Sequence, residues 1–357
     1  MKQHYFFAAL ILSGAISCAL LILPGVSGQT AGDRPRAAAT PTPTPPKAAE
    51  DEVIKVDTEL VNLNVRVVDR NNRPISGIKQ GEFKIFEDNV PQDIEFFSFS
   101  EIPTNYGIVI DNSGSLRQQL EKVIEAGKIL VNANRPSDET LIIRFVSRDK
   151  ITIEQNFTPK KADLIDALDN LYIEGGQTAI IDAVYLASEK VTEYQKDRNK
   201  DDRKRRALIV VSDGEDRDSY YSEAQLFEML RETDVQIYTI GFINDLSKEG
   251  GFISKSPQGK AKSLLQRLAS ETGGRSYFPN STADLAQIAK EIGSELRLQY
   301  SIGYIPTNDR KDGTFRNIKV VVDDGPGNQK RIPLTKAGRL AEGDGPAPAV
   351  KAPLTKP

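Results

Sequence analysis

Small oxygen-bearing side chains gather where apolar runs of this sequence end. Asp111, Ser113 and Ser115 follow the run YGIVI as a D-x-S-x-S pattern. Thr178 lies in GGQT, just before an amphipathic stretch, and Asp213 follows RALIVV in the segment VVSDGED. Such side chains cap helices and form turns, and they are also ligands of hard cations such as Mg²⁺. A turn, a helix cap, a metal site and a site that acts on a substrate are therefore all open at this point.

Each segment has an ordinary structural explanation when it is taken alone. Ser115 with Gln118 fits a capping box, Thr178 could be an N-cap, and Asp213 with Gly214 could form a turn. Their joint occurrence is harder to explain by chance, because all three segments fall at or beside the ends of predicted strands.

Four short runs are almost entirely apolar and rich in β-branched residues, which is typical of strands buried on both faces of a parallel sheet. They are YGIVI, TLIIRFV, RALIVVS and VQIYTIGF. Amphipathic stretches with helical spacing separate them. The alternation predicts a doubly wound, mostly parallel α/β domain over residues 104–295. Ligands of such sheets bind beyond the carboxyl ends of the strands, where the polar segments are expected to meet.

The two flanks of this region have a strand-like period of two. Val61, Leu63, Val65 and Val67 alternate with polar residues, and further apolar strands are predicted on both sides of the α/β region. A pair of strands is marginally stable by itself. We therefore predict that residues 53–100 and 296–335 together form one small β-sandwich into which the α/β domain is inserted.

Composition excludes several classes of function. The net charge is only −3, so no nucleic-acid partner is expected. The only histidine is His4 and the only cysteine is Cys18, and cleavage of the N-terminal segment would remove both. Disulfide frameworks, Cys/His zinc sites, histidine-based triads and cysteine nucleophiles are then excluded.

The five polar residues resemble the metal-ion-dependent adhesion site (MIDAS) of von Willebrand factor type A (VWA) domains, with every motif position filled. The order of predicted strands and helices over 104–295 matches that Rossmann-like fold. The flanking segments, including VNLNVRVVDRNNRPISGIKQGEFKIFEDNVPQDIEFF and LRLQYSIGYIPTNDRKDGTFRNIKV, resemble the VWFA-related acidobacterial-type domain. The resemblance covers roughly residues 53–335.

The resemblance implies that Ser113, Ser115 and Thr178 bind a divalent cation directly, while Asp111 and Asp213 act mostly through water or orient the others. Mg²⁺ is the expected ion, with Mn²⁺ and Ca²⁺ as alternatives. Three hydroxyls and two carboxylates would not saturate its charge, so water or an incoming carboxylate could take an open position. The expected partner is a protein that supplies a Glu or Asp to the metal, and no small-molecule substrate is expected.

Other functions fit the residues less well. A phosphatase of the haloacid-dehalogenase type would need a second Asp where this chain has Ser113, and no P-loop or dinucleotide-binding glycine motif is present. Metal-assisted hydrolysis lacks an obvious general base. The sequence predicts a binding module and not an enzyme, with a structural envelope protein whose metal site is idle as the alternative.

The two ends of the chain indicate export and flexible tethers. Lys2 and an apolar segment ending in VSG predict a signal peptide over residues 1–28, with an uncleaved membrane anchor as the alternative. Residues 29–52 are rich in Pro, Ala and Thr and predict a linker. Residues 337–357 predict a disordered tail. The mature protein is expected to be periplasmic or secreted, and to contact a membrane only if the segment is uncleaved.

Overall fold

The computed structural model describes residues 60–71, 73–99, 102–196, 204–249 and 255–341, all within one compact unit, Val56–Pro357. The predicted signal peptide at 1–28 and linker at 29–52 lie outside the described residues. Within the described ranges, no helix is both long and apolar enough to cross a membrane.

A six-stranded sheet forms the centre of the α/β region, with strand order β10-β9-β8-β5-β6-β7. Its pairs are parallel except for the edge strand β7, which runs antiparallel to β6. The elements in chain order are β5 (Thr104–Asp111), α1 (Leu120–Asn132), β6 (Glu139–Phe145), β7 (Ile151–Thr158), α2 (Lys161–Asp169), α3 (Ile180–Lys196), β8 (Arg205–Ser212), α4 (Glu223–Glu232), β9 (Val235–Gly241), α5 (Pro257–Thr272), β10 (Ser276–Tyr277) and α6 (Leu285–Glu295).

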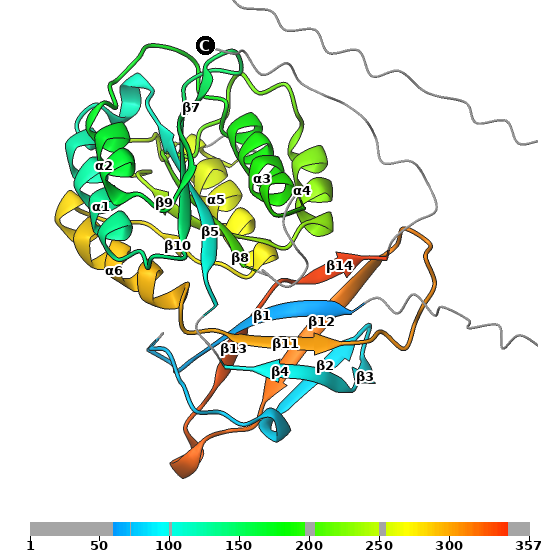
Figure 1. Cartoon of the computed structure of the whole chain (residues 1–357). Coiled ribbons are helices and arrows are strands. Elements are labelled where there is room, and N and C mark those ends of the chain that lie inside the picture. The colour runs from blue at the N-terminus through cyan, green and yellow to red at the C-terminus, as the bar shows by residue number, and fades with distance from the viewer. Residues whose placement is uncertain (1–59, 72, 100–101, 197–203, 250–254, 342–357) are drawn as a thin grey trace, which may run out of the picture. The chain divides into compact units, whose positions relative to one another are not determined.

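Helices cover both faces of this sheet, as Figure 1 shows. Successive side chains of β5 point to opposite faces. Ile108 and Ile110 therefore pack in a core with α1, α2 and α6, whereas Val109 packs in a second core with α3, α4 and α5. Burial on both faces explains why the central strands are apolar at nearly every position. The predicted α/β class with a mostly parallel, doubly wound sheet is confirmed.

Two four-stranded antiparallel sheets combine strands from both flanks of the α/β region (Figure 1). Their orders are β13-β1-β11-β4 and β14-β12-β2-β3. The strands are β1 (Val61–Val68), β2 (Phe83–Glu87), β3 (Val90–Gln92), β4 (Ile94–Ser98), β11 (Tyr300–Tyr304), β12 (Phe315–Val322), β13 (Ile332–Leu334) and β14 (Gly338–Leu340). Inward-facing residues of both sheets share one apolar core. Each sheet thus depends on strands that lie more than 200 positions apart in sequence, as in the pair β1–β11.

The start of the expected C-terminal tail needs a correction. Residues 338–340 form β14, which pairs with β12 through the register Phe315↔Leu340 and Asn317↔Gly338. Proline and glycine after Leu340 made the whole segment look irregular, but three residues are enough to extend an existing sheet edge. The rest of the predicted tail, from residue 342, lies outside the described residues.

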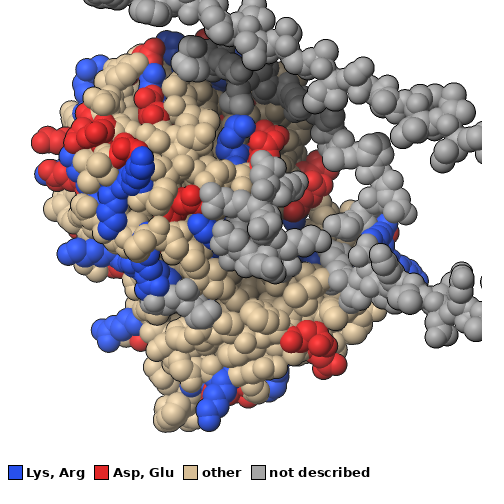
Figure 2. Space-filling view, in the orientation of Figure 1, with Lys and Arg blue, Asp and Glu red and all other residues tan. Residues whose placement is uncertain are grey.

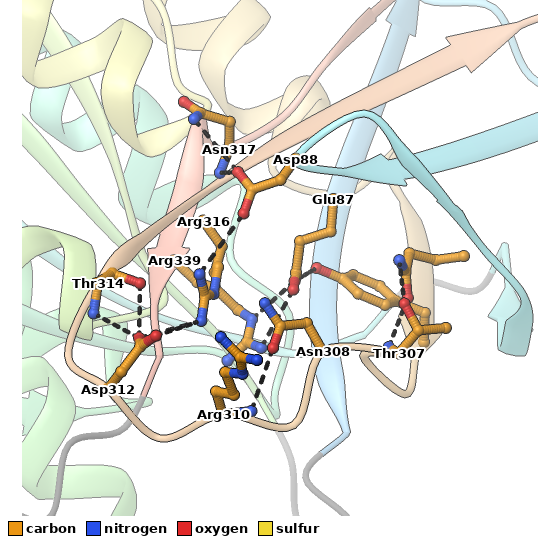
Figure 3. A network of polar contacts seen from close by, with 12 residues as sticks. Glu87, Asp88, Thr307, Asn308, Arg310, Asp312, Thr314, Arg316, Asn317 and Arg339 are labelled. Carbon is orange, nitrogen blue, oxygen red and sulfur yellow. Dashed lines mark hydrogen bonds and ion pairs between the residues drawn. The ribbon is translucent and has the colours of Figure 1, made fainter.

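A buried carboxylate in the sandwich is neutralised by the chain itself. Glu87, at the end of β2, accepts a hydrogen bond from Tyr304 Oη at 2.6 Å and from Arg339 Nε at 2.9 Å. Figure 3 shows Glu87 beside Arg339, with Asp312 and Arg316 nearby. The side chains of both Glu87 and Arg339 are almost fully buried. Their pairing explains how β14 is held to the sandwich core despite its short length.

A second buried ion pair links the sandwich to the α/β region. Arg66 of β1 pairs with Glu295 at the end of α6, and both side chains are buried. The guanidinium of Arg205 donates to the carbonyl oxygens of Leu296 and Gln299, at 3.1 and 2.9 Å. These bonds hold the segment between α6 and β11 against the start of β8. This is the amino end of the central strands, opposite to the end where the polar segments lie.

Candidate metal site

The polar segments meet at the carboxyl ends of the two central strands, β5 and β8. From β5 the chain continues through α1 to β6, which is its neighbour on one side in the strand order. From β8 the chain continues through α4 to β9, which lies in the opposite direction along the sheet. The two connections diverge over opposite faces, and sheets of this kind bind ligands in a crevice at such a switch point. We call this place the crevice. Because Ile110 pairs with Val211, Asp111 and Ser212 lie next to each other at its base.

Asp111 is fully buried at the centre of the crevice and has no ion pair among the described residues. Its Oδ1 accepts a hydrogen bond from Ser113 N at 2.9 Å, and its Oδ2 accepts one from Ser212 Oγ at 2.7 Å. Burial raises the pKa of its carboxyl to about 6, and the charge of nearby Asp213 adds to the increase. Asp111 is thus a carboxylate whose negative charge the protein's own residues leave uncompensated.

The two serine hydroxyls lie together above Asp111. Ser113 Oγ is 2.8 Å from Ser115 Oγ, and Ser113 is buried whereas Ser115 is exposed. The capping box expected for Ser115 and Gln118 is wrong, because α1 begins only at Leu120 with Gln119 as its N-cap. A 3-10 turn, Gly114–Leu116, lies between β5 and α1, and it leaves the Ser115 hydroxyl beside Ser113.

Asp213 follows Ser212 directly and is buried. Its Oδ1 accepts a hydrogen bond from Glu215 N at 2.9 Å, so the turn expected at Asp213-Gly214 is present and the carboxylate stabilises it. Gly214 has φ +78°, and a Cβ there would lie 2.8 Å from Leu265 Cδ1. Only glycine fits this backbone and this approach to α5. The turn fixes Asp213 close enough to Asp111 to raise its pKa.

Thr178 lies in a third segment, two residues before α3. Its carbonyl oxygen accepts hydrogen bonds from the backbone N–H groups of Arg217 and Asp218, at 2.8 and 3.2 Å. Thr178 is buried, and none of the described residues forms a hydrogen bond with its hydroxyl. The backbone bonds therefore join the Thr178 segment to the loop that follows Asp213.

A divalent cation fits the chemistry of this crevice. Two buried carboxylates without a basic partner are unfavourable by themselves, and a bound cation would compensate their charge. The described residues contain no group of three or more His, Cys, Asp or Glu placed to hold a metal. A cation here would depend on the hydroxyls of Ser113, Ser115 and Thr178 as well, and oxygen ligands of this kind suit Mg²⁺, Mn²⁺ or Ca²⁺.

A family model decides the relationship of this chain to known proteins. The model of the von Willebrand factor type A domain matches residues 107–291, just over half of the chain. The chain belongs to the VWA domain family. Members of this family are mostly adhesion and interaction modules.

Individual relatives of the VWA chain are more distant. A curated protein of Synechocystis, the uncharacterized protein sll0103, is 28% identical over 143 residues, which are 40% of this chain and 32% of that protein. The chain thus spans about a third of the length of that curated relative.

Solved structures give similar matches. An aerotolerance-related membrane protein from Bacteroides fragilis is 21% identical with TM-score 0.41, over 54% of this chain and 98% of that chain. A von Willebrand factor type A protein from Catenulispora acidiphila is 12% identical with TM-score 0.43, over 79% and 75%. Proximal thread matrix protein 1 from the mussel byssus, with a zinc-occupied MIDAS motif, is 16% identical with TM-score 0.44, over 55% and 48%.

Two supporting residues of the VWA site were not predicted. Ser212 donates to Asp111, as described above. Asn112 crosslinks three segments: its N–H donates to Phe145 O, its carbonyl accepts from Glu174 N, and its Nδ2 donates to Tyr172 O at 2.6 Å. Both residues lie inside the quoted motifs, but nothing in the sequence distinguishes an outward polar residue from one that holds neighbouring loops together.

A pair of aspartates behind Thr178 holds the third loop of the VWA site. Asp182, in the first turn of α3, accepts hydrogen bonds from the backbone N–H groups of Tyr220 and Tyr221, both at 2.8 Å. Asp216 accepts from Ile181 N and Ser219 Oγ, and burial raises the pKa of its carboxyl. Asp216 thus lies against the N-terminus of α3.

Proposed function

We propose that this VWA protein is an exported, metal-dependent protein-binding module. Asp111, Ser113, Ser115, Thr178 and Asp213 would hold one divalent cation, with Mg²⁺ as the expected ion. The observation that carries the proposal is the fully buried Asp111 carboxylate, which lies next to Asp213 and has no basic partner. A fold that leaves such a charge uncompensated gains stability when a cation binds beside it.

The positions of the hydroxyls support a particular division of roles. Ser113 and Ser115 have their oxygens 2.8 Å apart, as two ligands of one ion would, and the Thr178 hydroxyl is not used within the described protein. Asp111 is already held by two donors, Ser113 N and Ser212 Oγ, which favours an indirect role through water or through orientation of the serines.

A protein partner would complete this site with a carboxylate. The five residues supply only two negative charges, so a bound dication would retain affinity for a Glu or Asp side chain that approaches from solvent. Ser115 is exposed, which leaves an approach from that side. Metal and partner should then increase each other's affinity by the same factor, because coupling between two ligands is reciprocal.

Calorimetric titration of Mg²⁺ and Mn²⁺ into the purified chain tests the metal site. We expect saturable binding by the wild type and none by Asp111→Asn. Asp323→Asn is the matched control, since Asp323 is an exposed carboxylate of the sandwich, paired with Lys84, and its loss should leave binding unchanged. Equal titration curves for wild type and Asp111→Asn would refute the site.

Partner binding and export have separate tests. Proteins captured from envelope extract with Mg²⁺ should be released by a chelator, whereas chelator-insensitive partners would indicate a structural protein with an idle site. Turnover on a substrate panel would indicate an enzyme. N-terminal sequencing of the native protein should begin near residue 29, and an intact Met1 on a membrane-embedded chain would indicate an anchor.

A further inference from the structure

Three ion pairs on the loops around the candidate metal site share an arrangement in which the basic side chain is more exposed than the acidic one, although Arg144, which also pairs with Glu174, is more deeply buried than that partner. Arg217 is 60% exposed and its partner Glu215 only 18%. Arg148 is 55% exposed and its partner Asp218 21%. Lys150 is 42% exposed and Glu174 29%. In these three pairs the basic group lies on the solvent side of the acidic group, so the more exposed charge of each pair is positive.

Two of these pairs are attached to the site by its own backbone. Arg217 N and Asp218 N both donate to the Thr178 carbonyl oxygen, and Glu215 N donates to Asp213. Arg148 Nη2 reaches Asp218 at 3.0 Å and thereby joins the β6–β7 loop to the same segment. Arg148 and Arg217 therefore belong to loops that are bonded to the segments of the candidate metal site.

A third arginine stands in the D-x-S-x-S loop itself. Arg117 is exposed, its N–H donates to Gly114 O, and it has no ion pair among the described residues. Arg117, Arg148 and Arg217 come from three different loops around the crevice, and we call them the arginine rim.

Two exposed aromatic side chains occur on loops of the site, Tyr172 between α2 and α3 and Tyr220 in the loop of Arg217. Tyr172 is 53% exposed, with Arg144 stacked on its ring at 4.5 Å, and Tyr220 is 59% exposed. Tyrosine and arginine are the residue types most often found to dominate binding energy at protein interfaces. Their presence favours a protein surface over a small ion as the final occupant of this rim.

The charge of the whole molecule does not account for the rim. The chain has a net charge of −3, and on the face in Figure 2 Lys and Arg lie beside Asp and Glu, without one large area of either sign. Of the other acidic groups on the site loops, Asp216 stabilises the α3 N-terminus, and Asp149 is exposed beside Arg148, where it accepts a hydrogen bond from Ser147 Oγ. The positive character of the rim results from the depth of the charges and not from their number.

We infer that the partner of this site is an acidic protein segment, with at least two carboxylates beyond the one that would reach the cation. These carboxylates contact the exposed guanidinium groups of Arg117, Arg148 and Arg217, where planar N–H donors match carboxylate geometry. The inference rests on the proposed function, because the rim surrounds the proposed cation.

Labelled synthetic peptides test the inference with the full chain. One peptide carries a single Glu among glycine and serine, and a second carries the same Glu between further Asp and Glu residues. Affinity is measured by fluorescence anisotropy in excess Mg²⁺. The acidic peptide should bind wild type on the order of tenfold more tightly, as expected for several exposed ion pairs. The preference should shrink as NaCl rises from about 50 to about 300 mM.

Matched charge-neutralising variants locate the effect. The triple variant Arg117→Gln, Arg148→Gln, Arg217→Gln should lose the preference for the acidic peptide. The control Lys84→Gln, Lys319→Gln, Lys330→Gln removes the same charge from exposed lysines of the sandwich and should keep the preference. Mg²⁺ titration should be unchanged in both triple variants.

The outcomes separate this inference from the proposed function. Equal affinity for the two peptides, or a preference that survives in the arginine variant, overturns the acidic partner while normal Mg²⁺ binding leaves the metal site intact. Absence of Mg²⁺ binding in wild type overturns the proposed function instead. A single-stranded DNA oligonucleotide of equal charge is the third probe. If it binds as tightly as the acidic peptide and depends on the same arginines, the rim recognises polyanions in general and the inference is wrong.

Discussion

The sandwich and the crevice of the α/β domain each bury a carboxylate, and they treat it in opposite ways. Glu87 in the sandwich is enclosed with Arg339 and the Tyr304 hydroxyl (Figure 3). Burial, together with the hydrogen bond to Glu87, raises the pKa of Tyr304, so this hydroxyl remains a donor. Asp111 in the crevice has only neutral donors, and its nearest charged neighbour is a second carboxylate, Asp213.

The difference shows how a structural carboxylate can be distinguished from one that awaits a ligand. Burial alone does not do so, since both groups are almost inaccessible. Between these two carboxylates, the presence of a basic partner within the chain makes the distinction. Glu295 resembles Glu87 in having basic partners, because Arg66 and Arg275 both pair with it. Asp111 stands apart from both, and the proposed cation would take the place that an arginine has elsewhere.

Neutralising the sandwich carboxylate should have the largest effect on stability. Glu87→Gln removes the buried negative charge that pairs with Arg339, and we expect the free energy of unfolding to fall by about 3–5 kcal/mol. Urea denaturation of the chelated protein measures it. Asp323→Asn, at an exposed pair, should change stability by less than about 1 kcal/mol. A similar, small effect for both variants would show that the Glu87 network is not tightly coupled.

Added Mg²⁺ should stabilise the protein by binding in the crevice, without changing the ion pairs of the sandwich. With free Mg²⁺ at about 100 times its Kd, linkage predicts a gain of ~2.7 kcal/mol in the wild type. Thermal melts with Mg²⁺ and with chelator would show it as a higher Tm. Asp111→Asn should show no such increase. An equal increase in that variant would mean that Mg²⁺ acts at some other site.

Removing the charge of Asp111 should raise the free energy of unfolding of the chelated protein, whereas the change at Glu87 lowers it. In chelated protein the pKa of Asp111 rises from 3.8 to about 6 on folding, so the native state binds the proton more tightly. The resulting stabilisation is complete below pH 3.8 and is lost as the pH rises through about 6. Asp111→Asn has no carboxylate to bury, so it should be more stable than wild type by about 3 kcal/mol above pH 7. Denaturation at several pH values measures the difference, and a destabilised variant would contradict the comparison.

Much of the α/β fold was predictable because its central strands are buried on both faces. Short apolar runs rich in β-branched residues, such as YGIVI and RALIVV, are typical of such strands. β7 and β10 were not predicted. β7 is an edge strand with several half-buried polar residues, and β10 has only two residues, so neither carries an apolar run. β14 was missed for a related reason, since its three residues pair only because β12 already offers a sheet edge.

The candidate site was predictable in its residue types but not in its supports. The order of strands brings Asp111 and Asp213 to one crevice, and this followed from a general rule for parallel sheets. Asp182 and Asp216 could not be identified, because each accepts from backbone N–H groups that are distant in sequence. Asp182 accepts from Tyr220 and Tyr221, 38 and 39 positions away, and Asp216 accepts from Ile181, 35 positions away. The capping box predicted at Ser115 was wrong because α1 begins at Leu120, after the Ser115–Gln118 pattern. The 3-10 turn Gly114–Leu116 that precedes the helix is formed by the same residue types.

The smallest effect on stability should come from an exposed hydroxyl of the crevice, and it separates folding from metal binding most sharply. Ser115 is exposed and bonds only to Ser113 Oγ among the described residues. Ser115→Ala should therefore change the free energy of unfolding of chelated protein by less than about 0.5 kcal/mol. If Ser115 is a direct ligand, the same change should still weaken Mg²⁺ binding, on the order of tenfold, because a small dication demands near-ideal oxygen geometry.

Ser270→Ala on α5 is the matched control for Ser115→Ala. This serine is also exposed and donates weakly to Arg267 O at 3.4 Å. Both variants should melt like wild type in chelator, and only Ser115→Ala should respond less to Mg²⁺. If its Mg²⁺ affinity equals that of wild type, Ser115 is not a ligand, and the cation would lie deeper between Ser113, Thr178 and the two aspartates. Such a cation would be less accessible to a partner's carboxylate, so this one substitution also tests whether the crevice can present metal to another protein.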